Sequence, residues 1–188
     1  ECLAKLEVAK KRTPLHVPVV AAEIEECMRR FDGTAAIIIS DSAFHTSRDR
    51  VHTYYAIDLD LTEQAEIKKY GFHGLSVGSV ARCMKAAKLN HGKVIVCHIG
   101  SGSSVTALQD GCSFDTSMGY TPLEGVMMAT RCGDIDAAAA LAIGRELKLE
   151  GEKLEEYLNK KSGLLGVSGE SDDMRDVISL RDDGDERA

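Results

Sequence analysis

The feature that most constrains the fold is segment 93–118, where three strand-like runs are separated by glycine-containing turns. The runs "KVIVCHI" and "SSVTALQ" flank a loop at 100–102, and Asp110-Gly111 leads into "CSFDTSM". An Asp-Gly pair between two such runs is a strong signal for an antiparallel hairpin. The segment therefore predicts a mixed α/β domain and argues against a purely parallel, doubly wound sheet.

Two further runs are strand-like, and the rest of the chain favours helices. The continuous apolar run "AAIIIS" at 35–40 predicts a buried strand, as does Val94 to His98, while "HTYYAIDLDL" within 42–63 favours extended structure. Ser76 is a candidate N-cap for a helix that starts there. Helices are also expected at 20–31, at 134–147 with Asp134 or Asp136 as the cap, at 151–163 and in the last residues.

Composition narrows the function classes. Among 188 residues, 44% are apolar, which is enough for a core, and 23 basic against 30 acidic side chains give a net charge of -7. This charge argues against nucleic-acid and anionic-membrane partners, and no apolar run is long enough to span a bilayer. The six cysteines form no C-x-x-C pair and no His cluster has zinc spacing, so we expect reduced thiols, no metal site and a cytoplasmic location.

The glycine loop at 100–102 suits an anion. Gly100 and Gly102 leave the backbone bare, so that N–H groups can approach a ligand, and nearby serines add hydroxyl donors. The loop lacks the lysine of the common nucleotide-binding phosphate loop, and β-residues follow it where a dinucleotide fingerprint would open a helix. A Gly-Ser hairpin is more often a simple turn, and the spacing alone favours that interpretation.

Four charged or polar side chains are further candidate functional residues besides the glycine loop. Asp41 follows the apolar run, His73 lies in "YGFHG", His98 ends a strand-like run, and Arg131 interrupts a run of small residues. Each has a simple structural explanation: a cap, a core histidine, or a surface pair with Asp134 or Asp136. Together they are the groups that phosphoryl transfer needs, namely cations and neutral donors around the moving group, backbone amides and a carboxylate.

Six segments resemble the acetate kinase family. They are "TPLHVP" (13–18), "SDSAFH" (40–45), "YGFHG" (70–74), "VCHIGSGSSV" (96–105), "DTSMGYTPLEGVMMATRCGDID" (115–136) and "KSGLLGVSGESDDMRDV" (161–177). The resemblance runs from about Thr13 to the last residue, and the run at 115–136 is the most specific. It argues against a sugar-kinase relative on the same fold.

The resemblance implies the ribonuclease-H-like fold of actin, hexokinase and the heat-shock ATPases, with flanking helices and a mixed sheet that is incomplete here. It implies reversible phosphoryl transfer from ATP to acetate with Mg²⁺, giving acetyl phosphate and ADP. By motif, Asp41 would activate the carboxylate or place the metal, and His73 would stabilise the transition state. His98, Gly100, Ser101 and Gly102 would bind the phosphates of ATP, and Arg131 would hold the transferring phosphoryl group.

The match also has departures. Ser101 stands where the family has Asn, and Val77 stands where it has a second histidine. Family members are about twice as long, so we expect a middle piece: 1–41 from the end of the first domain and 42–188 from the start of the second. Propionate or butyrate as substrate, pyrophosphate as donor, a homodimer, and a non-catalytic fragment that lacks the nucleotide pocket all stay open.

Overall fold

A computed structural model describes residues 17–35, 37–89 and 92–188. The chain divides into two compact units, Glu1–Ile39 and Ser40–Ala188. The first contains α2 (Val17–Arg30), which confirms the helix predicted at 20–31. The assignment of 1–41 and 42–188 to two different domains stays a prediction.

The buried strand predicted at 35–40 is wrong. The described residues of this run have no regular structure, and Ile37 is 85% and Ile39 65% exposed. A continuous apolar run forms a buried strand only where a neighbouring strand and a covering layer exist. Among the described residues, no strand pairs with Ile37–Ile39.

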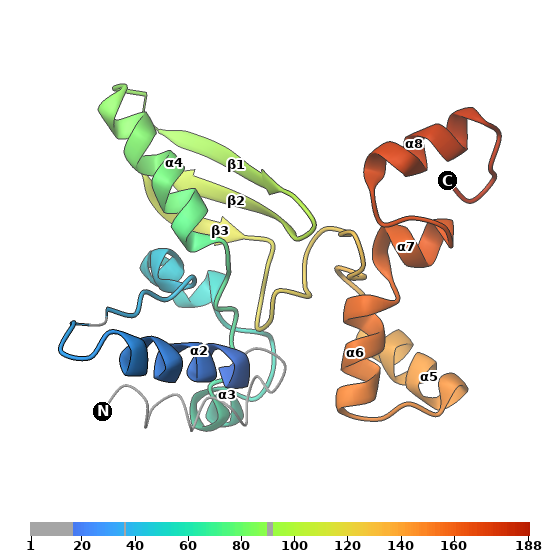
Figure 1. Ribbon diagram of the computed structural model, residues 1–188, viewed down its shortest axis with the longest axis horizontal. Helices are drawn as coiled ribbons and strands as arrows, with labels where there is room; N and C mark the ends of the chain where they lie inside the picture. Colours follow the sequence, from blue (N-terminus) through green and yellow to red (C-terminus); the bar gives the residue numbers. More distant parts are fainter. Residues whose placement is uncertain (1–16, 36, 90–91) are drawn as a thin grey trace. The chain divides into compact units, whose positions relative to one another are not determined.

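The second unit is built on the predicted hairpins. Strands β1 (Lys93–Ile99), β2 (Ser103–Gln109) and β3 (Cys112–Thr116) form one antiparallel sheet in the order β1-β2-β3 (Figure 1). The turn between β2 and β3 has Asp110 at φ 51° and Gly111 at φ 82°, the two positive angles of a type I′ hairpin. The hairpin prediction from Asp-Gly is therefore confirmed.

One face of this sheet packs on α4 (Gly74–Ala86). The core there is a cluster of Val77, Ala81, Val96 and Leu108. Strand β1 alternates, so Ile95 and Ile99 point to the other face and are 63% and 72% exposed. The strand predicted from Val94 to His98 is therefore confirmed, but its predicted burial is wrong for one face, because in the described structure only the other face of β1 is covered.

The segment before α4 is helical rather than extended. It contains two short 3₁₀ helices, η1 (Ala43–Ser47) and η2 (Arg50–His52), and α3 (Leu59–Ala65). The Asp58 carboxylate accepts a hydrogen bond from the Leu61 N–H at 2.8 Å, which caps α3. This local cap overrides the strand preference of "HTYYAIDLDL".

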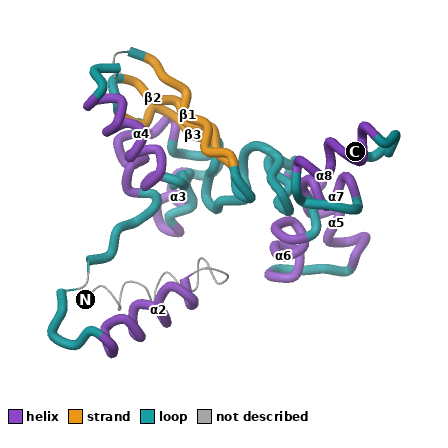
Figure 2. Tube along the Cα trace, turned by 45° about the horizontal axis from the view of Figure 1, so that its top comes forward, coloured by secondary structure: helices purple, strands orange, loops and turns teal. Residues whose placement is uncertain are grey.

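A long loop, 117–136, leads from the sheet to four helices (Figure 2). These are α5 (Ala137–Leu147), α6 (Glu152–Lys160), α7 (Gly163–Ser168) and α8 (Met174–Asp182). Asp136 caps α5 by accepting from the N–H groups of Ala138 and Ala139, as one of the two predicted caps. No helix among the described residues is long and apolar enough to cross a membrane.

Candidate active site

The two predicted histidines lie against each other. His98 is the sixth residue of β1, and His73 directly precedes α4 with a left-handed backbone, φ 59°. Their rings stack, with centroids 3.9 Å apart and planes 26° apart. Partial burial and the neighbouring His98 lower the pKa of His73. Two stacked imidazoles in a partly buried place repel each other when both are charged, so the neutral form of His73 is favoured.

Asp41 holds the backbone that carries His73. Its Oδ2 accepts from the His73 N–H at 2.7 Å, and its Oδ1 accepts from the Leu75 N–H at 3.3 Å. Its own carbonyl accepts from the Gly74 N–H at 2.8 Å. Asp41 thus meets the free amides of the first turn of α4 from a distant part of the chain. Ser76, the predicted cap, lies inside the helix, and His73 occupies the N-cap position.

Arg131 reaches the same place from the loop 117–136. Its Nη1 donates to the Pro122 carbonyl at 3.2 Å, and burial lowers the pKa of the guanidinium. The group nevertheless stays charged, because an arginine is not deprotonated in a protein. Asp134 instead accepts from the Gly125 N–H, and Asp136 caps α5. Within the described residues, Arg131 therefore has no carboxylate partner, and a surface pair does not explain it.

The glycine loop closes the site between these groups. A Cβ placed on Gly102 would lie 3.2 Å from Arg131 Nη1 and 3.6 Å from His73 Nε2. The space that this glycine leaves is therefore faced by a guanidinium and an imidazole nitrogen. Neither Gly100 nor Gly102 has a positive φ, so the need for glycine at 102 is room, not backbone freedom.

The amides of the loop are only partly available. The Gly100 N–H donates to the Gly102 carbonyl at 3.1 Å, and the Ser101 carbonyl accepts from the Ala129 N–H. These bonds fix the loop against residues that lead to Arg131. The amides of Ser101 and Gly102, which have no partner among the described residues, are the ones that an anion could use.

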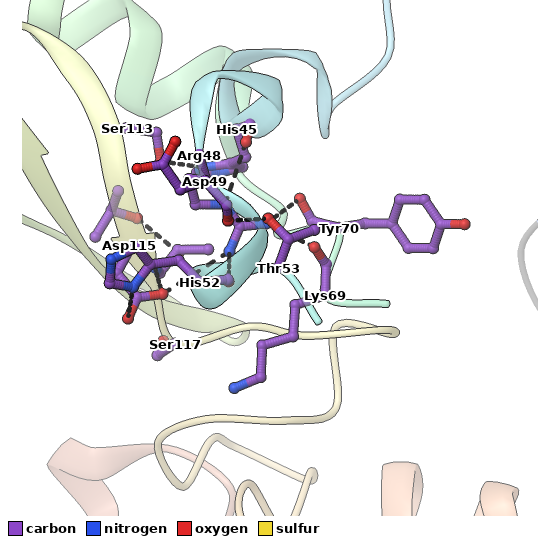
Figure 3. Close-up of polar contacts among 12 residues, drawn as sticks. His45, Arg48, Asp49, His52, Thr53, Lys69, Tyr70, Ser113, Asp115 and Ser117 are labelled. Atoms are coloured by element: carbon purple, nitrogen blue, oxygen red, sulfur yellow. Dashed lines mark hydrogen bonds and ion pairs between the residues drawn. The ribbon is translucent and has the colours of Figure 1, made fainter. Parts of the chain in front are cut away.

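A buried polar network supports the segment that presents His73 (Figure 3). The Arg48 side chain is only 1% exposed and donates to four carbonyls, those of His45, His52, Lys69 and Tyr70. It thereby joins η1 and η2 to the start of "YGFHG". Burial lowers the pKa of the Arg48 guanidinium, and Asp115 opposes this from 3.8 Å.

His45 supports the next residues of the same segment. It is 2% exposed, its Nε2 lies 2.8 Å from the Phe72 carbonyl and its Nδ1 2.8 Å from Ser113 Oγ. A carbonyl only accepts, so Nε2 carries the proton and Nδ1 accepts from the Ser113 hydroxyl. Burial lowers the pKa of His45, which agrees with a neutral ring that holds the residue before His73.

The structure thus brings together Asp41, His73, His98, Gly102 and Arg131, and their roles in catalysis stay predictions. Sequence reasoning missed the contacts of two serines: Ser76 Oγ lies 2.9 Å from His98 Nδ1, and Ser104 Oγ lies 2.9 Å from His73 Nδ1. A hairpin centred on Ser101 places residue 104 opposite 98, which is the observed register. The pairing of residues across the hairpin could therefore have placed Ser104 near the histidines from the sequence alone. The position of Ser76 could not be predicted in this way, because it depends on how α4 packs on the sheet.

A cleft of about 790 Å³ adjoins the loop. Its walls are mostly apolar and come from the loop, from 126–129 and from the start of α8. The lining includes Ile99, Gly100, Ser101, Val126, Met128 and Met174. Sequence reasoning did not find it, because its walls come from segments far apart in the chain.

Comparison with solved structures shows the class of protein. The chain superposes on a propionate kinase from Francisella tularensis with a TM-score of 0.91 and 39% identity, covering 98% of this chain and 48% of that one. It superposes on the acetate kinase of Entamoeba histolytica with a TM-score of 0.86 and 38% identity, again over 98% and 48%. The chain therefore has the fold of acetate and propionate kinases, which confirms the predicted fold class.

Sequence comparison then gives the family. The acetokinase family pattern matches residues 1–188. Acetate kinase from Clostridium botulinum is 43% identical over 191 residues, covering 100% of this chain and 48% of the relative. Acetate kinase from Fusobacterium nucleatum is 42% identical over 188 residues, covering 99% and 47%. The chain belongs to the acetokinase family, and it spans about half the length of the curated relatives it matches.

Proposed function

We propose that this protein takes part in reversible phosphoryl transfer from ATP to acetate, giving acetyl phosphate and ADP. One observation carries the proposal: the space beside Gly102 is faced by Arg131 Nη1 and His73 Nε2, at 3.2 and 3.6 Å from a Cβ built there. An atom in that space is close to hydrogen-bond distance of both groups. Such a space suits an anionic oxygen, and family membership supports a phosphoryl oxygen.

Direct in-line transfer fits these groups. A carboxylate oxygen attacks the γ-phosphorus as the bond to the β,γ-bridging oxygen breaks, and that electron pair leaves on ADP. Charge develops on the equatorial oxygens of the moving group. Arg131 and the imidazoles are held by the hydrogen bonds described above, so they stabilise this charge with little reorganisation.

The cleft beside the loop suits the nucleoside of ATP. It is mostly apolar and has a volume of about 790 Å³, and its lining includes Gly100 and Ser101 of the loop and Arg175 of α8. An apolar cleft with polar groups at one end is typical of a site for a base and its sugar. The phosphates would then extend along the loop toward Arg131.

The Mg²⁺ implied by the family would bind mainly through the phosphates of ATP, because Mg²⁺ takes one or two protein carboxylates together with substrate phosphates. Within the described ranges, no three His, Cys, Asp or Glu side chains gather as a metal-binding group. Asp41, the carboxylate assigned to this role by resemblance, accepts one backbone N–H on each oxygen, so each oxygen keeps a lone pair that could face a cation. The ion would neutralise phosphate charge, and we assign no step of the reaction to it.

Propionate is a second candidate substrate, since a propionate kinase is among the structures that superpose on the chain. One methylene in a pocket changes binding by only about 1–3 kcal/mol, so family membership does not decide between the two acids. We also propose a cytoplasmic location and a homodimer, both from the family resemblance.

The test is a hydroxamate assay for acyl phosphate on purified protein whose length is verified by intact mass. Acetate, propionate and butyrate are compared, with ATP or pyrophosphate as donor. We expect acetyl phosphate with ATP and a loss of about 10²–10³-fold in kcat for Arg131→Ala. Arg145→Ala, which removes an exposed arginine on α5, is the matched control. Equal rates for the two variants would refute the role of Arg131.

A sample of 20.3 kDa without activity would favour the alternative of a non-catalytic piece. In that case the chain would keep the phosphate-facing residues without the rest of the substrate site.

A further inference from the structure

The serine contacts of the two stacked histidines are crossed between elements. His73, which precedes α4, has its Nδ1 2.9 Å from the hydroxyl of Ser104 on β2. His98, on β1, has its Nδ1 2.9 Å from the hydroxyl of Ser76 on α4. The ring at the start of the helix is therefore bound to the sheet, and the ring on the sheet is bound to the helix.

Burial makes the Ser104 contact a strong constraint. Ser104 is 0% exposed, so water cannot replace either partner in its hydrogen bond. Ser76 is half-buried in the first turns of α4. Tying Nδ1 in this way leaves Nε2 as the free ring nitrogen, and Nε2 of His73 faces the space beside Gly102.

The proton on each ring decides whether that nitrogen attracts or repels an anion. A neutral imidazole carries one proton, on Nδ1 or on Nε2. With the proton on Nε2, the ring donates toward an anionic oxygen, while Nδ1 accepts from the serine hydroxyl. With the proton on Nδ1, a lone pair on Nε2 would face the same oxygen. A charged pair of rings is disfavoured, because the centroids are only 3.9 Å apart.

We propose that Ser76 and Ser104 are positioning residues that fix the tautomers of His98 and His73, with each hydroxyl donating to Nδ1 so that each ring carries its proton on Nε2, which in His73 faces the space for the reacting anion. This inference rests on the proposed function, because the anion is the transferring phosphoryl group. The serines act only through the histidines and do not touch the phosphoryl group.

The tautomers are tested directly by NMR of the imidazole ¹⁵N nuclei in the purified protein, with peaks assigned by His73→Gln and His98→Gln. We expect both rings as Nε2–H. Ser76→Ala should change the tautomer of His98, and Ser104→Ala should change that of His73. Ser79→Ala, an exposed serine on the same helix, is the control and should change neither. Two Nδ1–H rings in the unsubstituted protein, or no change in Ser76→Ala, would overturn the proposal.

Kinetics give a second and separable readout. Ser76→Ala should lower kcat by about tenfold, the equivalent of one hydrogen bond, with the KM for acetate unchanged. Ser76→Thr keeps the hydroxyl and should restore kcat. If Ser76 had a merely structural role, kcat would instead change in parallel with the folding stability of each variant. An unchanged kcat in Ser76→Ala would refute the link to catalysis.

Failure of the proposed function gives a different pattern. A protein without carboxylate kinase activity whose tautomers still respond to the serine variants would reject the reaction and support the assignment of the protons. Ser76 lies on the half-buried side of α4, so its variants decide the outcome even if Ser104→Ala does not fold.

Discussion

Replacing Gly102 with alanine tests the geometry on which the proposed function depends. The added methyl would lie 3.2 Å from Arg131 Nη1 and 3.6 Å from His73 Nε2. It would occupy the place where we expect a phosphoryl oxygen to accept from both groups. Removing one such donor costs about 2.7–4 kcal/mol of barrier, so blocking this place should lower kcat by at least about 10²-fold.

Stability should change little in the same variant. Gly102 does not have a positive φ, so alanine introduces no backbone strain. At 3.2 Å the methyl needs a shift of only a few tenths of an ångström, and its nearest neighbour is the end of a long side chain. The predicted signature is therefore a large loss of kcat with a nearly unchanged melting temperature.

Ser79→Ala is the control, because it changes an exposed small residue on α4 outside the site. Acetyl phosphate is trapped as the hydroxamate, and kcat and melting temperature are measured for both variants. The reasoning is refuted if Gly102→Ala is as active as Ser79→Ala, because the space beside residue 102 would then hold nothing that reacts.

Three further predictions concern the residues that support the site. Arg48→Met leaves buried carbonyls without a donor and should lower the free energy of unfolding by about 3 kcal/mol in urea titration; a loss under about 1 kcal/mol would contradict this. Asp41→Ala removes the acceptor for the N–H groups of His73 and Leu75. It should lower the free energy of unfolding by about 1 kcal/mol in the same titration, and an unchanged value would contradict this. His45 and His73 have lowered pKa values in the folded protein, so the unfolded chain, with histidine near 6.5, binds more protons. Their contribution to stability is complete above about pH 6.5 and is lost as the pH falls below it; a melting temperature that does not fall between pH 7 and pH 5.5 would contradict this.

The elements that the sequence predicted correctly are those whose signals are local. Asp110-Gly111 gives a type I′ turn because both residues take positive φ. Asp136 caps α5 because its carboxylate reaches amides two and three residues ahead. Neither needs a partner from elsewhere in the chain, so short-range chemistry is sufficient to predict it.

The errors arise where the outcome depends on distant partners. Ile37 and Ile39 have the residue types of a buried strand, but strand formation needs a neighbouring strand, which is not among the described residues. Ser76 has the right residue type and position for a helix cap, yet the cap contacts come from Asp41, more than thirty residues earlier. Residue type alone does not show which of two acceptors reaches the helix end.

For the candidate site, too, the sequence identified some features and missed others. Family resemblance selected Asp41, His73, His98 and Arg131, and the structure brings them together. It did not reveal why residue 102 must be small, because that depends on the separation of Arg131 Nη1 and His73 Nε2. Such a distance is set by the packing of a loop against a hairpin and cannot be deduced from spacing along the chain.

The way these side chains are held bears on how they would act. Asp41 fixes the backbone of His73, the hydroxyls of Ser104 and Ser76 hold the two rings, and the Pro122 carbonyl holds Arg131. All of these contacts lie within the unit Ser40–Ala188. The donors are therefore set by folding of this unit, before any ligand is present. Donors fixed in advance lower a barrier because little free energy is spent on reorienting them as charge develops.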